Sequence, residues 1–147
     1  MNNTNEMIVE FSSVAQNEGF ARMVVAAFIA GTNPTLEEVS DVKTAVSEAV
    51  TNSIIHGYED SDGRIRIKAQ VTGRQVYLEI EDQGKGIEDV EKAMEPMFTT
   101  KPDEDRSGMG FSFMEAFMDK VEVESTYGQG TVVKMWKEIG VGGHQFD

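Results

Sequence analysis

Apolar residues occupy every second position in two neighbouring segments, residues 64–71 and residues 75–82. Such alternation is typical of strands that bury one face. The residues between them, Thr72-Gly73-Arg74, suit a tight turn, so the two segments are predicted to form a β-hairpin. Shorter apolar and β-branched runs predict further strands at residues 7–11, 121–125 and 131–139.

Three further segments are predicted to be helical. The first covers residues 13–30 and ends at Gly31. Asn33 and Pro34 provide an N-cap and first-turn signal for a second helix, which we expect to continue to about Tyr58. The third helix is short and covers residues 111–118.

The segment from Gly84 to Gly108 is rich in glycine and charge, and only residues 89–94 within it look helical. An irregular segment of this length in a compact domain usually has a function. The pattern therefore indicates a mobile loop, and we expect it to act as a lid over a ligand.

The order of the predicted elements is strand, helix, helix, hairpin, loop, helix, strand, strand. Helices gathered on one face of a mainly antiparallel sheet form an α+β two-layer sandwich. A chain of 147 residues is long enough for one domain and short for two. We expect a single domain over residues 1–139 and a flexible tail over residues 140–147.

The chain is acidic, with 26 acidic and 13 basic residues and a formal net charge of -13. Such a surface repels phosphate backbones and anionic lipids, so neither direct nucleic-acid binding nor membrane binding is expected. The sequence has no cysteine, no export signal is evident, and the longest strongly apolar run, residues 23–30, is far below the roughly 20 residues of a membrane span. A cytoplasmic location is expected.

Three polar residues recur every fourth position in the second helix: Glu48, Asn52 and His56. This spacing places them along nearly one helix face. The Asn52 carbonyl suits Mg²⁺ that takes its other ligands from phosphates and water. Glu48 could orient or deprotonate a nucleophile or hold a metal-bound water, and the alternative is an ordinary polar helix face in solvent.

Asp82 ends the second strand of the hairpin and continues its apolar face. A carboxylate directed toward the core needs a partner, and the exocyclic amino group of adenine would suit it. Gly84 and Gly86 would let the backbone turn sharply next to a ligand. The alternative is an acidic turn in which Asp82 caps its own backbone.

A glycine pair, Gly108 and Gly110, opens the third helix, where free N–H groups and the helix dipole favour phosphate. The flanking Lys101 and Arg106 could fold over the phosphates or remain solvated charges. Residues 128–131, Gly128-Gln129-Gly130-Thr131, form a fourth nucleotide contact or simply a hairpin turn.

Taken together and in this order, these motifs resemble those of the GHKL ATPases. The resemblance implies the Bergerat ATP-binding fold, ATP or ADP as ligand, and Mg²⁺ bound by Asn52. It implies adenine recognition by Asp82 and a phosphate loop around Gly108 and Gly110. The positions expected to contact the nucleotide are Asn52, His56, Asp82, Gly84, Gly86, Thr99, Lys101, Arg106, Ser107, Gly108, Met109, Gly110 and Thr131.

Four segments, residues 16–22, 47–58, 98–102 and 106–111, resemble the anti-sigma F factors of endospore-forming bacteria, a family of small GHKL serine kinases. The only histidines, His56 and His144, are not placed as the phosphoacceptor of a sensor kinase. The extra domains of Hsp90, gyrase and MutL proteins are not expected either.

This closer resemblance implies a homodimer that binds and inhibits sporulation sigma factor F and phosphorylates a serine of an anti-anti-sigma factor. It implies that Glu48 is the catalytic base and that Arg22 contacts a partner. Two alternatives stay open: a related serine kinase of a stress-response system, and a nucleotide-gated binding module with little catalysis.

The first helix offers an independent indication of an interface. Between Phe20 and Ala30 its only charged residue is Arg22. A helix that is apolar over so much of its circumference has more apolar surface than packing on one sheet requires. We therefore expect the surface around Val25 and Ile29 to lie in a homodimer or partner contact.

Overall fold

The computed structural model describes residues 4–59, 62–94 and 110–140. They form a five-stranded sheet in the order β1-β2-β3-β5-β4, and every neighbouring pair of strands is antiparallel. The strands are β1 (Thr4–Ser12), β2 (Arg64–Thr72), β3 (Gln75–Asp82), β4 (Lys120–Thr126) and β5 (Gly130–Glu138). The expected antiparallel sheet is confirmed.

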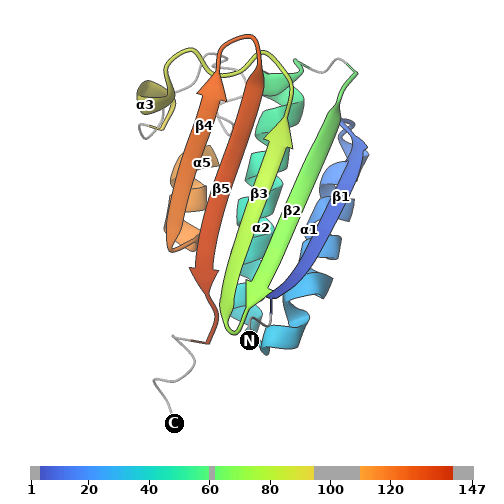
Figure 1. Cartoon of the computed structure of the whole chain (residues 1–147), viewed down its shortest axis with the longest axis vertical. Helices are drawn as coiled ribbons and strands as arrows, with labels where there is room; N and C mark the ends of the chain where they lie inside the picture. Colours follow the sequence, from blue (N-terminus) through green and yellow to red (C-terminus); the bar gives the residue numbers. More distant parts are fainter. Residues whose placement is uncertain (1–3, 60–61, 95–109, 141–147) are drawn as a thin grey trace.

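The helical elements are α1 (Gln16–Ile29), η1 (Ala30–Thr32), α2 (Leu36–Asn52), η2 (Ser53–Gly57), α3 (Val90–Ala93) and α5 (Gly110–Phe117). Figure 1 shows α1, α2 and α5 side by side on one face of the sheet, with α3 set apart near the end of β4. The molecule is therefore the expected α+β two-layer sandwich. No helix in the described part of the chain is long and apolar enough to cross a membrane.

The core lies between the sheet and the helices, and the alternating pattern of the hairpin decides which residues enter it. The inward positions of β2 and β3 are almost fully buried: Ile65, Ile67, Ala69, Val76, Leu78 and Ile80. Helix α2 buries Val42, Val46 and Val50 against them. Each of these large apolar side chains contributes about 1.5–3 kcal/mol when it leaves water.

The start of α2 differs from the prediction. Asn33 is not the N-cap, because it adopts a left-handed conformation with φ 58° after η1. Thr35 is the N-cap: its hydroxyl accepts the Glu38 N–H at 3.0 Å, and its own N–H donates to Glu38 Oε1 at 2.9 Å. This reciprocal pair is a capping box, which satisfies two backbone donors at once.

The end of α2 differs as well. The regular α-helix stops at Asn52, and residues 53–57 continue it as the single wider turn η2, a π-helix. The Tyr58 N–H reaches back five residues to the Ser53 carbonyl at 2.9 Å. Such π turns are rare and are frequently found at functional sites.

The expected interface around Val25 and Ile29 is wrong. Both side chains are fully buried in the core of the single chain, together with Ala21 one turn earlier. The apolar residues that α1 does expose are Phe20, 48% exposed, and Met23, 63% exposed. Helix α1 is apolar around much of its circumference for two reasons. One side packs against α2 and the sheet, and another side carries the exposed residues Phe20 and Met23.

The capping box gives a stability prediction. We expect Thr35→Ala to lower the free energy of unfolding by about 1 kcal/mol, because the Glu38 N–H loses its acceptor. Urea denaturation measures this change. The control is Ser40→Ala, at an exposed position of the same helix, which should stay within about 0.5 kcal/mol of the unmodified protein. Equal losses in the two variants would contradict the capping role.

Candidate functional site

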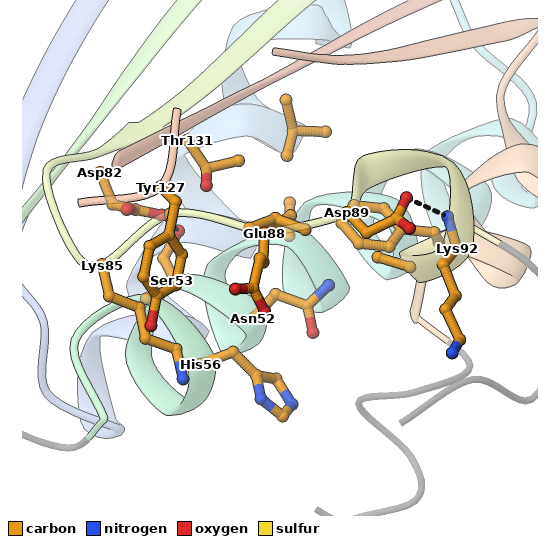
Figure 2. Close-up of a pocket in the computed structure, with 17 residues that line it drawn as sticks. Asn52, Ser53, His56, Asp82, Lys85, Glu88, Asp89, Lys92, Tyr127 and Thr131 are labelled. Atoms are coloured by element: carbon orange, nitrogen blue, oxygen red, sulfur yellow. Dashed lines mark hydrogen bonds between the residues drawn. The ribbon is translucent and has the colours of Figure 1, made fainter. Parts of the chain in front are cut away.

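A cavity of about 580 Å³ opens where the end of β3 meets the end of α2. Its wall comes from α2 and η2, from the segment after β3, from α3 and α5, and from the β4–β5 turn (Figure 2). The lining residues are Ala49, Asn52, Ser53, His56, Gly57, Asp82, Lys85, Gly86, Ile87, Glu88, Asp89, Lys92, Ala93, Phe111, Tyr127, Thr131 and Val133.

Asp82 is the buried carboxylate of this cavity, only 5% exposed. Its Oδ2 accepts the Ser53 hydroxyl at 2.7 Å, and its Oδ1 accepts the Gly84 N–H at 2.9 Å. Burial raises the pKa of Asp82, and these hydrogen bonds, with one from the Thr131 backbone, oppose that rise. The predicted inward direction of Asp82 is confirmed, and its bond to Gly84 shows that it also caps its own turn.

Asn52 is the last residue of α2 and lines the same cavity. Both polar atoms of its amide are buried, and neither has a hydrogen-bond partner among the described residues. Figure 2 shows this amide and the His56 ring on the same side of the helix end, where both residues line the cavity. A buried amide without a partner is costly, so this position indicates a ligand that supplies the missing bonds.

Glu48 does not line the cavity. Its side chain is 8% exposed on α2, one turn before Asn52. The structure therefore brings Asn52, His56, Asp82, Gly86 and Thr131 together in the cavity wall, and Glu48 is not among these lining residues. The wider turn η2 separates His56 from the ideal helical row that the spacing predicted.

Gly84 and Gly86 are required by close contacts within the protein. A Cβ atom at Gly84 would overlap the Gly57 carbonyl, and the Lys85 N–H donates to this same carbonyl at 2.8 Å. Gly86, with φ +78°, lies against the Thr126 carbonyl of β4. The two glycines thus hold the segment after β3 between η2 and the β4–β5 turn, where it forms part of the cavity wall.

Residues 128–131 belong to the hairpin that the sequence predicted, and Thr131 among them lines the cavity. They form the turn between β4 and β5, in which the Gln129 N–H donates to the Thr126 carbonyl at 2.8 Å. The register pairs Thr131 with Asp82 across β5 and β3. Thr131 is consequently buried at the cavity wall beside the carboxylate.

Several lining residues were missed by the sequence analysis. Ser53 contacts Asp82 from the end of α2, and no motif in the sequence singled it out. Lys85, which pairs with Glu59 at 3.0 Å, and Lys92 follow the Asp82 motif in a segment where charges look like ordinary surface residues. Tyr127 directly precedes the glycine pair of the β4–β5 turn, and that position was its only signal.

Other predicted site residues fall elsewhere. Thr99, Lys101, Arg106, Ser107, Gly108 and Met109 lie outside the described residues, and Gly110 is the first residue of α5. Arg22 is on α1, away from the cavity, and its Nε lies 2.8 Å from Glu18 Oε2.

The fold and the cavity together have the architecture of a nucleotide-binding domain, with a buried carboxylate at one end and an unpaired amide nearby. The family model described as Histidine kinase-like ATPase domain matches residues 11–137. The chain is also similar in fold to the RsbU and RsbW domains of Rv1364c from Mycobacterium tuberculosis, with a TM-score of 0.67 and 17% identity over 92% of this chain and 32% of that one. The catalytic domain of the histidine kinase ThkA gives a TM-score of 0.58, with 19% identity over 90% of this chain and 96% of that one.

In sequence, the chain is more similar to two anti-sigma F factors than to these structures. The anti-sigma F factor of Thermoanaerobacter sp. (strain X514) is 60% identical over 95% of this chain and 98% of its own length. The anti-sigma F factor of Clostridium botulinum (strain Eklund 17B / Type B) is 58% identical over 93% of this chain and 96% of its own length. The chain therefore belongs to the anti-sigma F factors, within the histidine kinase-like ATPases, and is a nucleotide-binding protein of that kinase-like class.

The glycine contacts predict a specific loss of stability. We expect Gly84→Ala to lower the free energy of unfolding by about 1–3 kcal/mol, because the new methyl group would overlap the Gly57 carbonyl. Gly31→Ala is the matched control, since a Cβ there meets nothing within 4 Å, and it should change stability by less than about 0.5 kcal/mol. Urea denaturation of both variants measures the difference. If Gly84→Ala proved as stable as Gly31→Ala, the close contact would be refuted.

Proposed function

We propose that this protein is an ATP-dependent protein serine/threonine kinase and an anti-sigma factor, with its nucleotide in the 580 Å³ cavity. The observation that carries this proposal is the pairing of a buried carboxylate, Asp82, with the unpaired buried amide of Asn52 in the wall of one cavity. The first suits a base and the second suits the phosphate end of a nucleotide.

Asp82 would read the base. The carboxylate already accepts three hydrogen bonds from the protein, and of its roughly four lone pairs one is left for another donor. The exocyclic amino group of adenine is such a donor, whereas guanine carries a carbonyl acceptor at the same ring position. An ionised Asp82 therefore favours adenine over guanine.

Asn52 fits a magnesium site. Its buried carbonyl is a neutral hard oxygen without a partner among the described residues, the kind of ligand that Mg²⁺ accepts beside phosphate and water oxygens. When bound, Mg²⁺ would neutralise negative charge on the phosphates. The described cavity wall carries three carboxylates, Asp82, Glu88 and Asp89, against two ammonium groups, Lys85 and Lys92. It therefore offers little positive charge of its own to the phosphates.

The rest of the phosphate site would come from the segment before α5. Backbone N–H groups of a helix start bind phosphate, and cations next to them strengthen the binding. We assign this role to Gly108 and Gly110 with Lys101 and Arg106, and we place Thr99, Ser107 and Met109 beside the same nucleotide.

Glu48 would act as the general base. It lies one helical turn from Asn52, close enough in the chain for both to serve one reaction. The serine oxygen attacks the γ-phosphorus, the bond to the ADP oxygen breaks, and the serine proton passes to the Glu48 carboxylate. Such a transfer depends mainly on positioning and on compensating the phosphate charge.

The partners follow from the family. Its members are named for sigma factor F, so we propose sigma factor F as the protein that this chain inhibits and an anti-anti-sigma factor as the serine substrate. Arg22 is the proposed partner contact, and it borders a second depression of about 350 Å³ between α1 and α2. We further propose a cytoplasmic homodimer with one domain over residues 1–139 and a flexible tail over residues 140–147.

One observation favours a second candidate, a nucleotide-gated binding module with little catalysis. Glu48 is buried in α2 and does not line the cavity. In that case, nucleotide binding would control partner affinity while phosphoryl transfer stays slow.

Titration with ATP, ADP and GTP, with and without Mg²⁺, tests the nucleotide site. Calorimetry should show adenine-selective binding, and Asp82→Asn should weaken ADP binding by at least about 10-fold, because the amide replaces an acceptor oxygen by a donor. The control is Asp119→Asn on the exposed residue before β4, which should leave affinity unchanged. Absence of nucleotide binding by the folded protein would refute the function.

A phosphorylation assay tests the base. Glu48→Gln should bind ADP within about 3-fold of the unmodified protein and lose roughly 10²- to 10⁴-fold in phosphoryl transfer to the anti-anti-sigma factor. Glu37→Gln, at an exposed position of the same helix, serves as control. Unchanged transfer in Glu48→Gln would remove Glu48 from the mechanism, and very slow transfer by the unmodified protein would favour the binding module.

A further inference from the structure

Ser53 lies at the junction where α2 becomes η2, directly after Asn52. It is 4% exposed, and its hydroxyl donates to Asp82 Oδ2 at 2.7 Å. A serine hydroxyl has one proton, so this bond uses the only proton that the hydroxyl can donate.

The backbone of Ser53 is held on both sides. Its N–H donates to the Ala49 and Val50 carbonyls, and its carbonyl accepts the Tyr58 N–H at 2.9 Å. The hydroxyl therefore projects from a rigid helical turn, and the position of this turn sets the direction of the bond to Asp82.

The carboxylate of Asp82 is enclosed on its other sides by backbone. Gly84 donates to Oδ1 at 2.9 Å, and a Cβ at Gly57 would lie 3.0 Å from both carboxylate oxygens. One side-chain donor, two backbone donors at Gly84 and Thr131, and the bare Cα of Gly57 thus determine how Asp82 is rotated. Ser53 is the only one of the four whose side chain makes the contact, so it can be removed without changing the backbone.

We propose that Ser53 is a positioning residue for base recognition. Its hydroxyl holds the Asp82 carboxylate in the rotation that directs a free lone pair at the exocyclic amino group of adenine, and it thereby sets the preference for adenine over a base with a carbonyl at that position. This inference rests on the proposed function of the cavity.

The different directions of two consecutive side chains support this role. Asn52 directs its amide into the cavity, whereas Ser53 directs its hydroxyl at the carboxylate (Figure 2). One helix end thus reaches the phosphate side and the base side of the same ligand.

The test compares ADP with IDP, whose base carries a carbonyl in place of the amino group. Calorimetry on the full chain should show that Ser53→Ala binds ADP about 5- to 10-fold more weakly and IDP within about 2-fold of the unmodified protein, so the ratio of the two affinities narrows. A merely structural role would weaken both ligands equally, and that result would overturn the inference. Circular dichroism confirms that the variant is folded.

Ser47→Ala is the matched control, because it removes another serine hydroxyl from α2, one bound to the Glu18 carboxylate instead of Asp82. It should leave both affinities unchanged. In the Asp82→Asn background, Ser53→Ala should have no further effect on the ratio, since the two changes act on one contact. Additive effects would overturn the inference. A titration of the unmodified protein separates failure of this inference from failure of the proposed function. If the unmodified protein bound neither nucleotide, the proposed function itself would be refuted.

Discussion

The site depends on one buried hydrogen-bonded group, the carboxylate of Asp82. An ionised carboxylate cannot be taken out of water without donors, and Ser53, Gly84 and the Thr131 backbone supply them from three different elements. The end of α2, the segment after β3 and the start of β5 must therefore meet at one point. The close contacts at Gly57 and Gly84 follow from this meeting, because any side chain there would push the elements apart.

The two-layer architecture explains why those elements can meet. β3 pairs with β5, so that Asp82 lies opposite Thr131 although about fifty residues separate them in the chain. α2 lies against the same region of the sheet (Figure 1). Its end brings Ser53 to the carboxylate, and the wider turn that follows brings Gly57 there. The regular pairing of β3 with β5 thus fixes the place where the irregular turn η2 packs.

The charge of this chain opposes the binding of a nucleotide, so other contacts must provide the affinity. The net charge of -13 repels phosphate at long range, and the described cavity wall is itself slightly acidic. In the proposed site, recognition depends on short-range contacts: one carboxylate for the base, one amide for a metal, and backbone N–H groups with nearby cations for the phosphates. In such a site the orientation of donors and acceptors matters more than net charge, so the hydrogen bonds that orient Asp82 are important for binding.

The periodic elements could be predicted from the sequence because their signals are local. Alternation over residues 64–82 predicted the hairpin and the inward direction of Asp82, since strand side chains alternate regardless of what packs on them. The motifs around Asn52, Asp82 and Thr131 likewise predicted that these residues share a site, and their side chains do line one cavity. Ordered motif spacing also indicated the family.

Tertiary packing decided the features that have no local signal in the sequence. The burial of Val25 and Ile29 could not be read from an apolar helix, because composition does not say which side faces the sheet. Thr35 became the N-cap because its side chain and Glu38 satisfy each other, which outweighed the signal at Asn33. The π turn after α2, which takes His56 out of the helical row of Glu48 and Asn52, arises where helix, strand and loop are packed together. The sequence by itself thus determined the fold class, the family and the residue types of the site, and only the folded chain decided which of those residues touch, since contacts depend on neighbours that are distant along the chain.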